Sequence, residues 1–309
     1  MLYSIVNYKT VKKSSGSLRY DSEYFQIQPL LTKISTSNHV ELHTISKWVT
    51  QGPNPKFADF GIYCLTGRNI STGKLSLEGS DLVDETEYKK WSRYKLLKGD
   101  ILITLKGAGS TGKVAIFHSD KKAIFSRNLG LIRLINQKIS PEFLFAFFSS
   151  VLGQKIIDRG VTGGTGQLTL PTSYMKTLPI PDFSDEFVVR ITGLIIDSQN
   201  AIEKSTSLYT QAEQLILSEL NLLDWKPKHT LSFIKNYSDT QKAERIDAEY
   251  FQPKYEEIVE AIKRYDGGFD ELGDLVKIKK NIEPGSEAYQ ENGIPFVRVS
   301  NLSKFELSA

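Results

Sequence analysis

The sequence predicts an α+β protein. A first domain built on a curved mixed β-sheet with flanking helices is followed by one long coiled-coil helix and then by the incomplete start of a second domain of the same kind. Three observations support this prediction: apolar residues recur every seven positions from 185 to 223, an eight-residue segment beginning at Arg19 returns at Arg245, and four apolar runs bounded by turn residues precede the heptad region. These features divide the chain into residues 1–182, 183–224, a polar linker at 225–244, and 245–309.

The first domain begins with a short amphipathic helix after Asp21 and continues with strands expected at 61–65, 100–105, 113–117 and 129–135. A buried helix is expected to start after Ser140, with Pro141 at its first position, and to run to about Ile157. The prolines of the segment LPIP at 178–181 are expected to stop any strand and turn the chain.

The long helix is predicted from two neighbouring heptad series, and no Pro or Gly follows Gly193 within it. A repeat held over about five heptads favours a single helix of roughly 60 Å. A helix of that length needs a partner helix, from this chain or another, to cover its apolar side. The residues expected at that interface are Leu194, Ile195, Ile202, Leu208, Tyr209, Leu215, Ile216, Leu222 and Leu223.

The repeated segment reads RYDSEYFQ at 19–26 and RIDAEYFQ at 245–252, with six of eight positions identical. A repeat at such a long spacing indicates a duplicated domain. The second copy opens with an amphipathic helix expected at 253–262 and stops at Ala309, before any second long helix. The sequence is therefore interpreted as a fragment or as a naturally shortened gene product.

Composition is that of an ordinary globular protein, with 40% hydrophobic residues, 24% charged residues and a net charge of +3. Any surface for nucleic acid would have to come from local clustering of charge. The single cysteine, Cys64, cannot form an internal disulfide, which fits a reducing compartment, and its apolar surroundings favour a buried strand residue. No apolar run reaches about 18 residues and no secretory signal core is present, so a soluble cytoplasmic protein is expected.

One segment resembles a phosphate-binding loop. Residues 107–113 read GAGSTGK, but the position that should carry a hydroxyl is Val114, and the following residues favour a strand instead of a helix. The preferred interpretation is a glycine-rich hairpin loop, and a nucleotide hydrolase remains an alternative. The four histidines have no metal-ligand spacing, and neither a nucleophile–histidine pattern nor a methyltransferase signature is present. We therefore predict a non-catalytic chain without cofactor or metal.

Side chains with DNA-reading chemistry gather in the expected loops of the first domain. Arg pairs bidentately with guanine, Asn or Gln pairs with adenine, and Lys contacts phosphate, so double-stranded DNA is the expected ligand. A coiled-coil assembly protein that never touches DNA is the remaining alternative. The candidate DNA-binding residues are Arg68, Asn69, Lys106, Ser110, Thr111, Lys113, Lys121, Lys122, Arg127, Asn128, Arg159, Thr165 and Gln167.

The order of these features resembles the specificity (S) subunit of type I restriction-modification enzymes. The resemblance rests on the repeated segment, on GDILI at 99–103 followed by GKVA at 112–115, on LPIP at 178–181, and on the long helix after it. It implies that residues 1–182 are a target recognition domain and that residues 245–309 begin a second one.

The resemblance further implies that each recognition domain reads half of a bipartite DNA target and that two antiparallel helices set the gap between the halves. Two modification (methyltransferase) subunits would dock to form an adenine-N6 methyltransferase, and restriction would need a motor-nuclease subunit. This chain lacks most of the second recognition domain and the second helix, and a two-fold homodimer could restore the helix pair.

Overall fold

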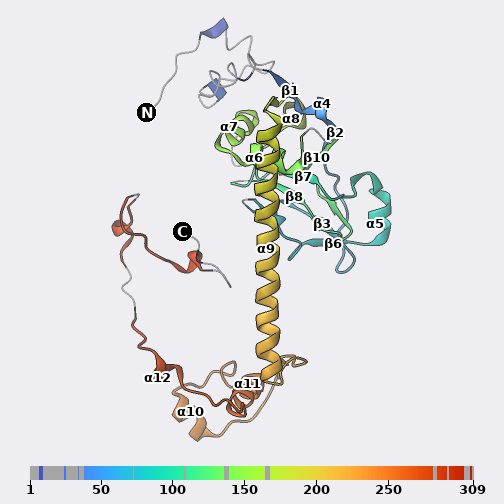
Figure 1. The fold of residues 1–309 in the computed structure, drawn as a ribbon. Coiled ribbons are helices and arrows are strands. Elements are labelled where there is room, and N and C mark those ends of the chain that lie inside the picture. The colour runs from blue at the N-terminus through green and yellow to red at the C-terminus, as the bar shows by residue number, and fades with distance from the viewer. Residues whose placement is uncertain are drawn as a thin grey trace. The chain divides into compact units, whose positions relative to one another are not determined.

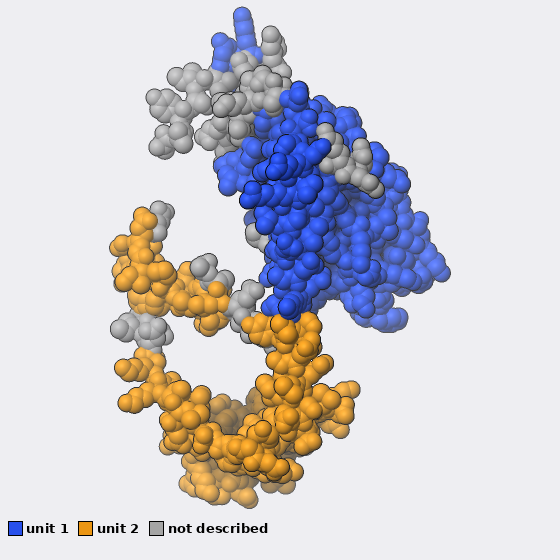
Figure 2. Space-filling view, in the orientation of Figure 1, with its two compact units in different colours: residues 1–206 blue, residues 207–309 orange. Residues whose placement is uncertain are grey.

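The computed structural model describes residues 7–9, 24–25, 34, 38–71, 73–107, 109–135, 139–163, 168–280, 284–290, 292–302 and 307. The chain forms two compact units, residues 1–206 and 207–309 (Figure 2). The long helix α9 (Asp185–Glu219) begins in the first unit and ends in the second (Figure 1). The strands and helices confirm the predicted α+β class. No helix in the described part of the chain is long and apolar enough to cross a membrane.

The central sheet of the first unit has four antiparallel strands. Their order is β2 (Ser46–Gln51), β10 (Leu129–Leu134), β7 (Asp100–Thr104) and β8 (Val114–Phe117). Every residue of β7 and β8 is buried, because both faces of the sheet are covered. Coverage on both faces explains why the sequences of these strands are continuous apolar runs and do not alternate between apolar and polar residues.

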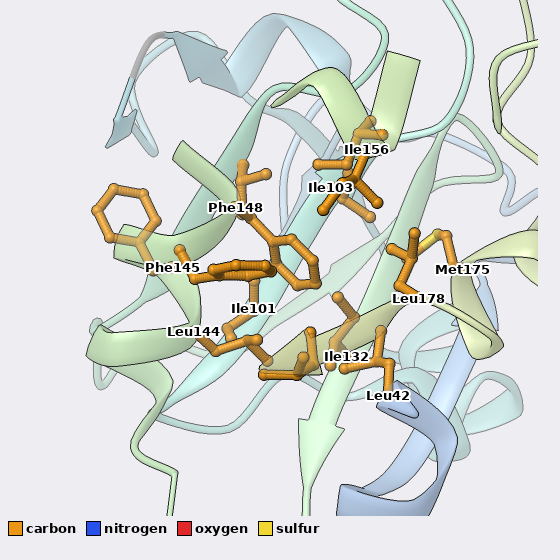
Figure 3. Packing of buried hydrophobic residues seen from close by; sticks show 14 of the residues in the cluster. Leu42, Ile101, Ile103, Ile132, Leu144, Phe145, Phe148, Ile156, Met175 and Leu178 are labelled. Atoms are coloured by element: carbon orange, nitrogen blue, oxygen red, sulfur yellow. The ribbon is translucent and has the colours of Figure 1, made fainter. Parts of the chain in front are cut away.

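Neighbouring residues of β7 point into different cores. Ile101 and Ile103 pack with Leu144 and Phe148 on the face covered by helices α6 (Pro141–Ser149), α7 (Val151–Gly160) and α8 (Thr172–Lys176) (Figure 3). Leu102 belongs to the core on the other face. Side chains that alternate across a strand in this way join the two cores through the sheet.

The second sheet differs from the prediction of one curved mixed sheet. It has the order β6 (Asp81–Val83), β3 (Ile62–Leu65), β9 (Ala123–Phe125), with β3 antiparallel to β6 and parallel to β9. The strand expected at 61–65 is therefore part of this smaller mixed sheet, whereas the other three expected strands are in the central sheet. Leu65 and Phe125 connect the two sheets through the shared core.

The expectation that the prolines of 178–181 stop any strand was wrong. β11 (Pro179–Pro181) pairs antiparallel with β1 (His39–Glu41), and Ile180 lies opposite Val40. In this two-stranded ribbon only one edge of β11 is paired, and prolines are tolerated on such edge strands because their missing N–H groups can face away from the partner. The other short elements of the first unit are β4 (Ile70–Ser71), β5 (Lys74–Leu75), α4 (Leu42–Ile45), α5 (Glu85–Lys90), and the 3₁₀ turns η1 (Gly67–Asn69) and η2 (Ser92–Tyr94).

The single helix expected from 141 to about 157 is two helices that break at Ser150. Ser150 is extended, with ψ 158°, and its Oγ accepts a hydrogen bond from the Gly153 N–H at 3.1 Å. A Cβ on Gly153 would lie 2.0 Å from the Phe147 carbonyl oxygen. The absence of a side chain at Gly153 therefore lets α7 turn back tightly against the end of α6.

Helix α9 ends four residues before the predicted Leu223. Asn221 has φ 55°, the Asn221 N–H donates to the Ser218 carbonyl at 3.0 Å, and the Leu222 N–H donates to the Leu217 carbonyl at 2.7 Å. This pair of hydrogen bonds is a Schellman motif, in which Asn supplies the left-handed residue. Leu222, which is buried, and Leu223, which is exposed, therefore lie beyond the end of the helix to which they were assigned.

The second unit contains α10 (Tyr237–Ala243), α11 (Pro253–Lys263), α12 (Leu272–Leu275), η3 (Ser286–Ala288) and η4 (Val299–Asn301). Helix α11 confirms the amphipathic helix expected at 253–262. The stretch 225–244, expected to be a polar linker, instead contains α10. In the repeated segment, Gln252 is buried and forms two hydrogen bonds with the backbone of Thr230, at 2.9 and 3.0 Å.

The first copy of the repeated segment lies largely outside the described residues, as does the short helix expected after Asp21. Its Tyr24 and Phe25 are described, and their rings meet edge to face with centroids 5.0 Å apart. Tyr250 and Phe251 in the second copy meet in the same way at 4.8 Å. The two copies therefore share this local ring arrangement.

Candidate nucleic-acid interface

Several loops of the first unit meet at one edge of its two sheets. Strands β2 and β7 end at this edge, β8 and β10 begin there, and the parallel strands β3 and β9 both end there. The described loop residues at this edge are 66–69, 105–107, 109–113, 126–128, 161–163 and 168–170. We call this surface the loop edge.

The loop at 105–113 closes a β-hairpin between β7 and β8. The Thr104 N–H donates to the Lys113 carbonyl at 2.9 Å, and the Gly112 N–H donates to the Thr104 carbonyl at 2.8 Å. Gly112 has φ 88°, and a Cβ there would lie 2.9 Å from Ile157, so the loop requires glycine and packs on α7. Lys106 is exposed, whereas Ser110, Thr111 and Lys113 are partly exposed.

This geometry contradicts the alternative of a nucleotide hydrolase. The amide N–H groups of residues 110–113 all donate to carbonyl groups of Thr104, Gly107 or Ser110, so they do not point at a bound anion. The loop also leads into strand β8, whereas a phosphate loop leads into a helix N-terminus. The expected hairpin loop is confirmed.

Backbone hydrogen bonds hold three of the loops together. The Asn128 carbonyl accepts from the N–H groups of Leu105, at 2.8 Å, and Lys106, at 3.3 Å. The Leu170 N–H donates to the Leu105 carbonyl at 2.8 Å, and Lys106 forms an isolated bridge with Thr169. Lys106, Ser110, Thr111 and Lys113 are thereby brought close to the exposed Arg127 and Asn128. Two further candidates, Thr165 and Gln167, lie outside the described residues.

Sequence reasoning missed Gln51, which positions the turn at 126–128. Its Nε2 donates to the Arg127 carbonyl at 2.6 Å, and the adjacent Gly52 lies so close to Ser126 that a Cβ would approach the Ser126 carbonyl oxygen to 2.3 Å. A polar residue followed by glycine at the end of a strand was the available signal. Gln51 fixes the backbone from which Arg127 and Asn128 project.

Arg68 and Asn69 have different roles although they are adjacent. Arg68 is exposed at the loop edge, and its guanidinium contacts the Asp81 carboxylate at 2.6 Å. Asn69 is 4% exposed, and its amide binds the Thr66 N–H at 2.8 Å, the Ser76 carbonyl and the Ser80 hydroxyl. Asn69 is therefore a structural residue and not a DNA contact, which corrects the prediction.

Two other predicted contacts lie apart from this group. Arg159 on α7 donates through Nε to the Tyr24 carbonyl at 3.2 Å, and its guanidinium carbon lies 3.9 Å from the centroid of the Tyr24 ring. That position ties α7 to Tyr24, so Arg159 lies on a helix and not in a loop as expected. Lys121 and Lys122 precede β9 and therefore lie at the opposite edge of the sheets from the loop edge.

The described residues offer no metal-binding cluster at this edge. No cluster of three or more His, Cys, Asp or Glu that could hold a metal ion occurs in the part of the chain the structure describes. Cys64 is fully buried, as predicted, and burial together with the nearby Asp81 charge raises the pKa of its thiol to about 12. A thiol with such a pKa is not a nucleophile near neutral pH.

Comparison with known families decides what this domain is. Residues 55–186 match the family model described as the type I restriction modification DNA specificity domain. Residues 55–186 are a type I DNA specificity domain. The matched range contains most of the loop edge, from Arg68 to Leu170, together with the start of α9.

The specificity domain has relatives among curated proteins and solved structures. The MjaVIII specificity subunit of a type I restriction enzyme from Methanocaldococcus jannaschii is 27% identical over 129 residues, which cover 41% of this chain and 30% of that protein. The type I S subunit from M. genitalium is 14% identical, with a TM-score of 0.34, over 60% of this chain and 42% of that one. The HsdS subunit from Thermoanaerobacter tengcongensis is 14% identical, with a TM-score of 0.38, over 64% and 50%. The chain thus spans half or less of each relative.

Proposed function

We propose that this chain acts as a sequence-specific DNA recognition subunit of a type I restriction-modification complex. The observation that carries the proposal is the loop edge: three loops tied by backbone hydrogen bonds present Lys106, Lys113, Arg127 and Asn128 within the matched specificity domain. Residues held by a rigid sheet edge keep a fixed spacing, which base reading requires. The chain itself has no catalytic role in this proposal.

The side chains of the loop edge divide by chemistry. Arg68 and Arg127 suit the O6 and N7 acceptors of guanine, and Asn128 suits adenine, at about 1–3 kcal/mol of discrimination per well-formed pair. Lys106 and Lys113 suit phosphates, which fix the position of the protein on the duplex without reading sequence. Ser110 and Thr111 add short hydroxyl groups at the same edge.

Helix α9 supports the second part of the proposal, which is that it pairs with another such helix and sets the distance between two half-sites. Its apolar residues remain exposed along the helix in the described chain, although Ile195 packs partly against the core of its own domain. A solvated apolar stripe of this length indicates a missing partner. The exposed members of the stripe are Phe187, Leu194, Ile202, Leu208, Tyr209, Leu215 and Ile216.

The partner helix is supplied either by a second copy of this chain or by a longer form of it. We further propose that two modification subunits dock on the assembled specificity subunits to methylate adenine, and that a motor-nuclease subunit joins for restriction. The type I family membership of the domain supports both parts of this proposal.

Selection from a random-sequence duplex library tests the DNA-reading role. The wild-type chain is expected to enrich one short sequence, and Arg127→Gln with Asn128→Ala is expected to lose that enrichment while retaining weaker binding. Lys242→Gln on α10 is the control and should enrich the wild-type sequence. Enrichment of the same sequence by the Arg127/Asn128 variant would contradict the assignment of the loop edge.

A further inference from the structure

The edge of the sheets opposite the loop edge carries a group of cations around an aromatic ring. Trp48 on β2 lies opposite Arg133 on β10. Three cations contact its ring: the guanidinium carbons of Arg133 and Arg93 lie 4.7 and 5.5 Å from the centroid, and the Lys47 Nζ lies 5.8 Å from it. Cations gather at such a ring because its π-face is electron-rich.

One of these cations is neutralised, and the other two are not. The Arg133 guanidinium donates to both oxygens of the buried Asp100 carboxylate, at 2.7 and 2.6 Å, and also to the Lys95 carbonyl. Arg93 and Lys47 are exposed and have no carboxylate within 4.0 Å in the described part of the chain. Arg133 therefore fixes the ring, and the ring holds two positive charges that no described carboxylate neutralises.

Further lysines without an ion pair among the described residues lie near this ring. Lys95 places its Nζ 4.3 Å from the Tyr88 ring centroid, and the adjacent Leu96 N–H donates to the Ala123 carbonyl at 2.9 Å. That hydrogen bond brings the exposed Lys121 and Lys122 to the same edge. Lys98, near the same rim, forms an ion pair with Asp120 at 2.8 Å. We call Lys47, Trp48, Arg93, Lys95, Lys121 and Lys122 the Trp48 patch.

We propose that the Trp48 patch binds phosphates of the DNA backbone, away from the base pairs read at the loop edge. This inference rests on the proposed function, which supplies double-stranded DNA as the ligand. The Trp48 face is already occupied by guanidinium groups, so the patch offers charge and N–H donors instead of a stacking platform for a base. Contacts of that kind position a protein on DNA and carry no sequence information.

The length of β2 gives the spacing between the two surfaces. From Trp48 to the end of β2 at Gln51 the strand advances three residues, which at ~3.3 Å per residue places the Trp48 patch roughly 10 Å from the loop edge. At ~3.4 Å per nucleotide along one strand, this distance corresponds to about three base pairs. The patch is therefore expected to require DNA that extends about three base pairs beyond the sequence that is read.

The test measures binding of the full chain to a mixed-sequence duplex while the NaCl concentration is varied. Lys47→Gln with Arg93→Gln is expected to reduce the slope of log K against log [NaCl] by about 1.8, because each lost phosphate contact removes about 0.9. Lys242→Gln with Lys277→Gln removes the same charge from the second unit and is expected to leave the slope unchanged. Thermal unfolding of each variant checks that folding is retained, and a folded patch variant with the wild-type slope would overturn the proposal.

Two further measurements separate this proposal from the proposed function. Shortening the duplex by about three base pairs on the patch side should weaken wild-type binding and abolish the difference between wild type and the patch variant. If the patch variant loses salt dependence while wild type enriches no sequence in library selection, the patch proposal stands and the specificity proposal fails. If DNA binding is unchanged but binding of a modification subunit is lost, the ligand is an acidic protein surface and the phosphate proposal is wrong.

Discussion

Asn69 and Arg68 have the side chains that proteins use to read adenine and guanine, yet only Arg68 is exposed at the loop edge. The Asn69 amide instead completes a capping box with Thr66 and ties residues 76 and 80 to the turn. The sequence identified both residue types correctly as polar loop residues. It could not separate them, because the difference arises from hydrogen bonds to residues up to eleven positions away.

Replacing Asn69 with alanine is expected to lower the free energy of unfolding by about 2 kcal/mol, because buried N–H and C=O groups lose their partner. Urea unfolding measures this change. Arg68→Gln at the next position is the control, with an expected change below about 0.5 kcal/mol because its ion pair is exposed. Equal losses in the two variants would contradict a structural role specific to Asn69.

Glu87 on α5 gives the fold a defined response to acid. Hydrogen bonds from Lys90, the Lys56 N–H and Trp91 lower the pKa of its carboxyl group from 4.5 to about 2. Because the pKa is lower in the folded protein than in the unfolded chain, the ionised Glu87 stabilises the fold at pH values above about 4.5. This contribution is lost as the pH falls from about 4.5 towards 2. Glu87→Gln is expected to flatten the fall of the urea midpoint in this range, whereas the exposed Glu78→Gln should retain it. A wild-type pH profile in the Glu87 variant would refute this linkage.

At the scale of elements, the expected strands at 61–65, 100–105, 113–117 and 129–135 each agree with an observed strand to within one residue at either end. Sharp turn residues bound these apolar runs, so local sequence was sufficient. The division into two sheets was not predictable in the same way, because β3 pairs in parallel with β9, which lies about sixty residues later. The loop edge results from these strand directions, and its grouping of residues therefore needed the structure.

The corner between α6 and α7 depends on Gly153, and a pair of matched glycine substitutions tests it. Gly153→Ala is expected to destabilise the protein by about 3 kcal/mol, because the new Cβ would meet the Phe147 carbonyl oxygen at 2.0 Å. Gly193→Ala in α9 has open space around its Cβ and is expected to stabilise by about 0.5–1 kcal/mol. Thermal unfolding compares the two, and a stabilising Gly153→Ala would show that the corner does not require a bare backbone.

Helix α9 is expected to mediate self-association through its apolar stripe. Leu208→Glu with Leu215→Glu should convert a dimer into a monomer in sedimentation velocity at micromolar concentration, because both side chains are more than half exposed in the single chain. Ser207→Glu with Gln214→Glu adds the same charge on the opposite face and should leave the dimer intact. If the wild-type chain is strictly monomeric, the homodimer proposal is wrong. The second helix would then have to come from a longer form of the chain.

At the scale of the whole molecule, the family could be inferred from the order of motifs, although each motif is loose by itself. The repeated segment, the hairpin, the proline pair and the long helix occur in sequence, and the family match covers residues 55–186. The separation of charge between two edges of one domain was not visible in a net charge of +3. That separation depends on which strand ends lie at the same edge of the sheets. Lys121 and Lys122 were therefore grouped with the residues of the loop edge, whereas the structure places them at the opposite edge.

Methylome sequencing tests the central claim most directly. Cells that contain the modification subunit are compared with and without this gene, and with the Arg127→Gln/Asn128→Ala variant. Adenine-N6 methylation is expected at one bipartite sequence only when the gene is present, and one half-site is expected to be lost or altered in the variant. The same adenine methylation in all three strains would contradict the claim that this chain selects the DNA sequence.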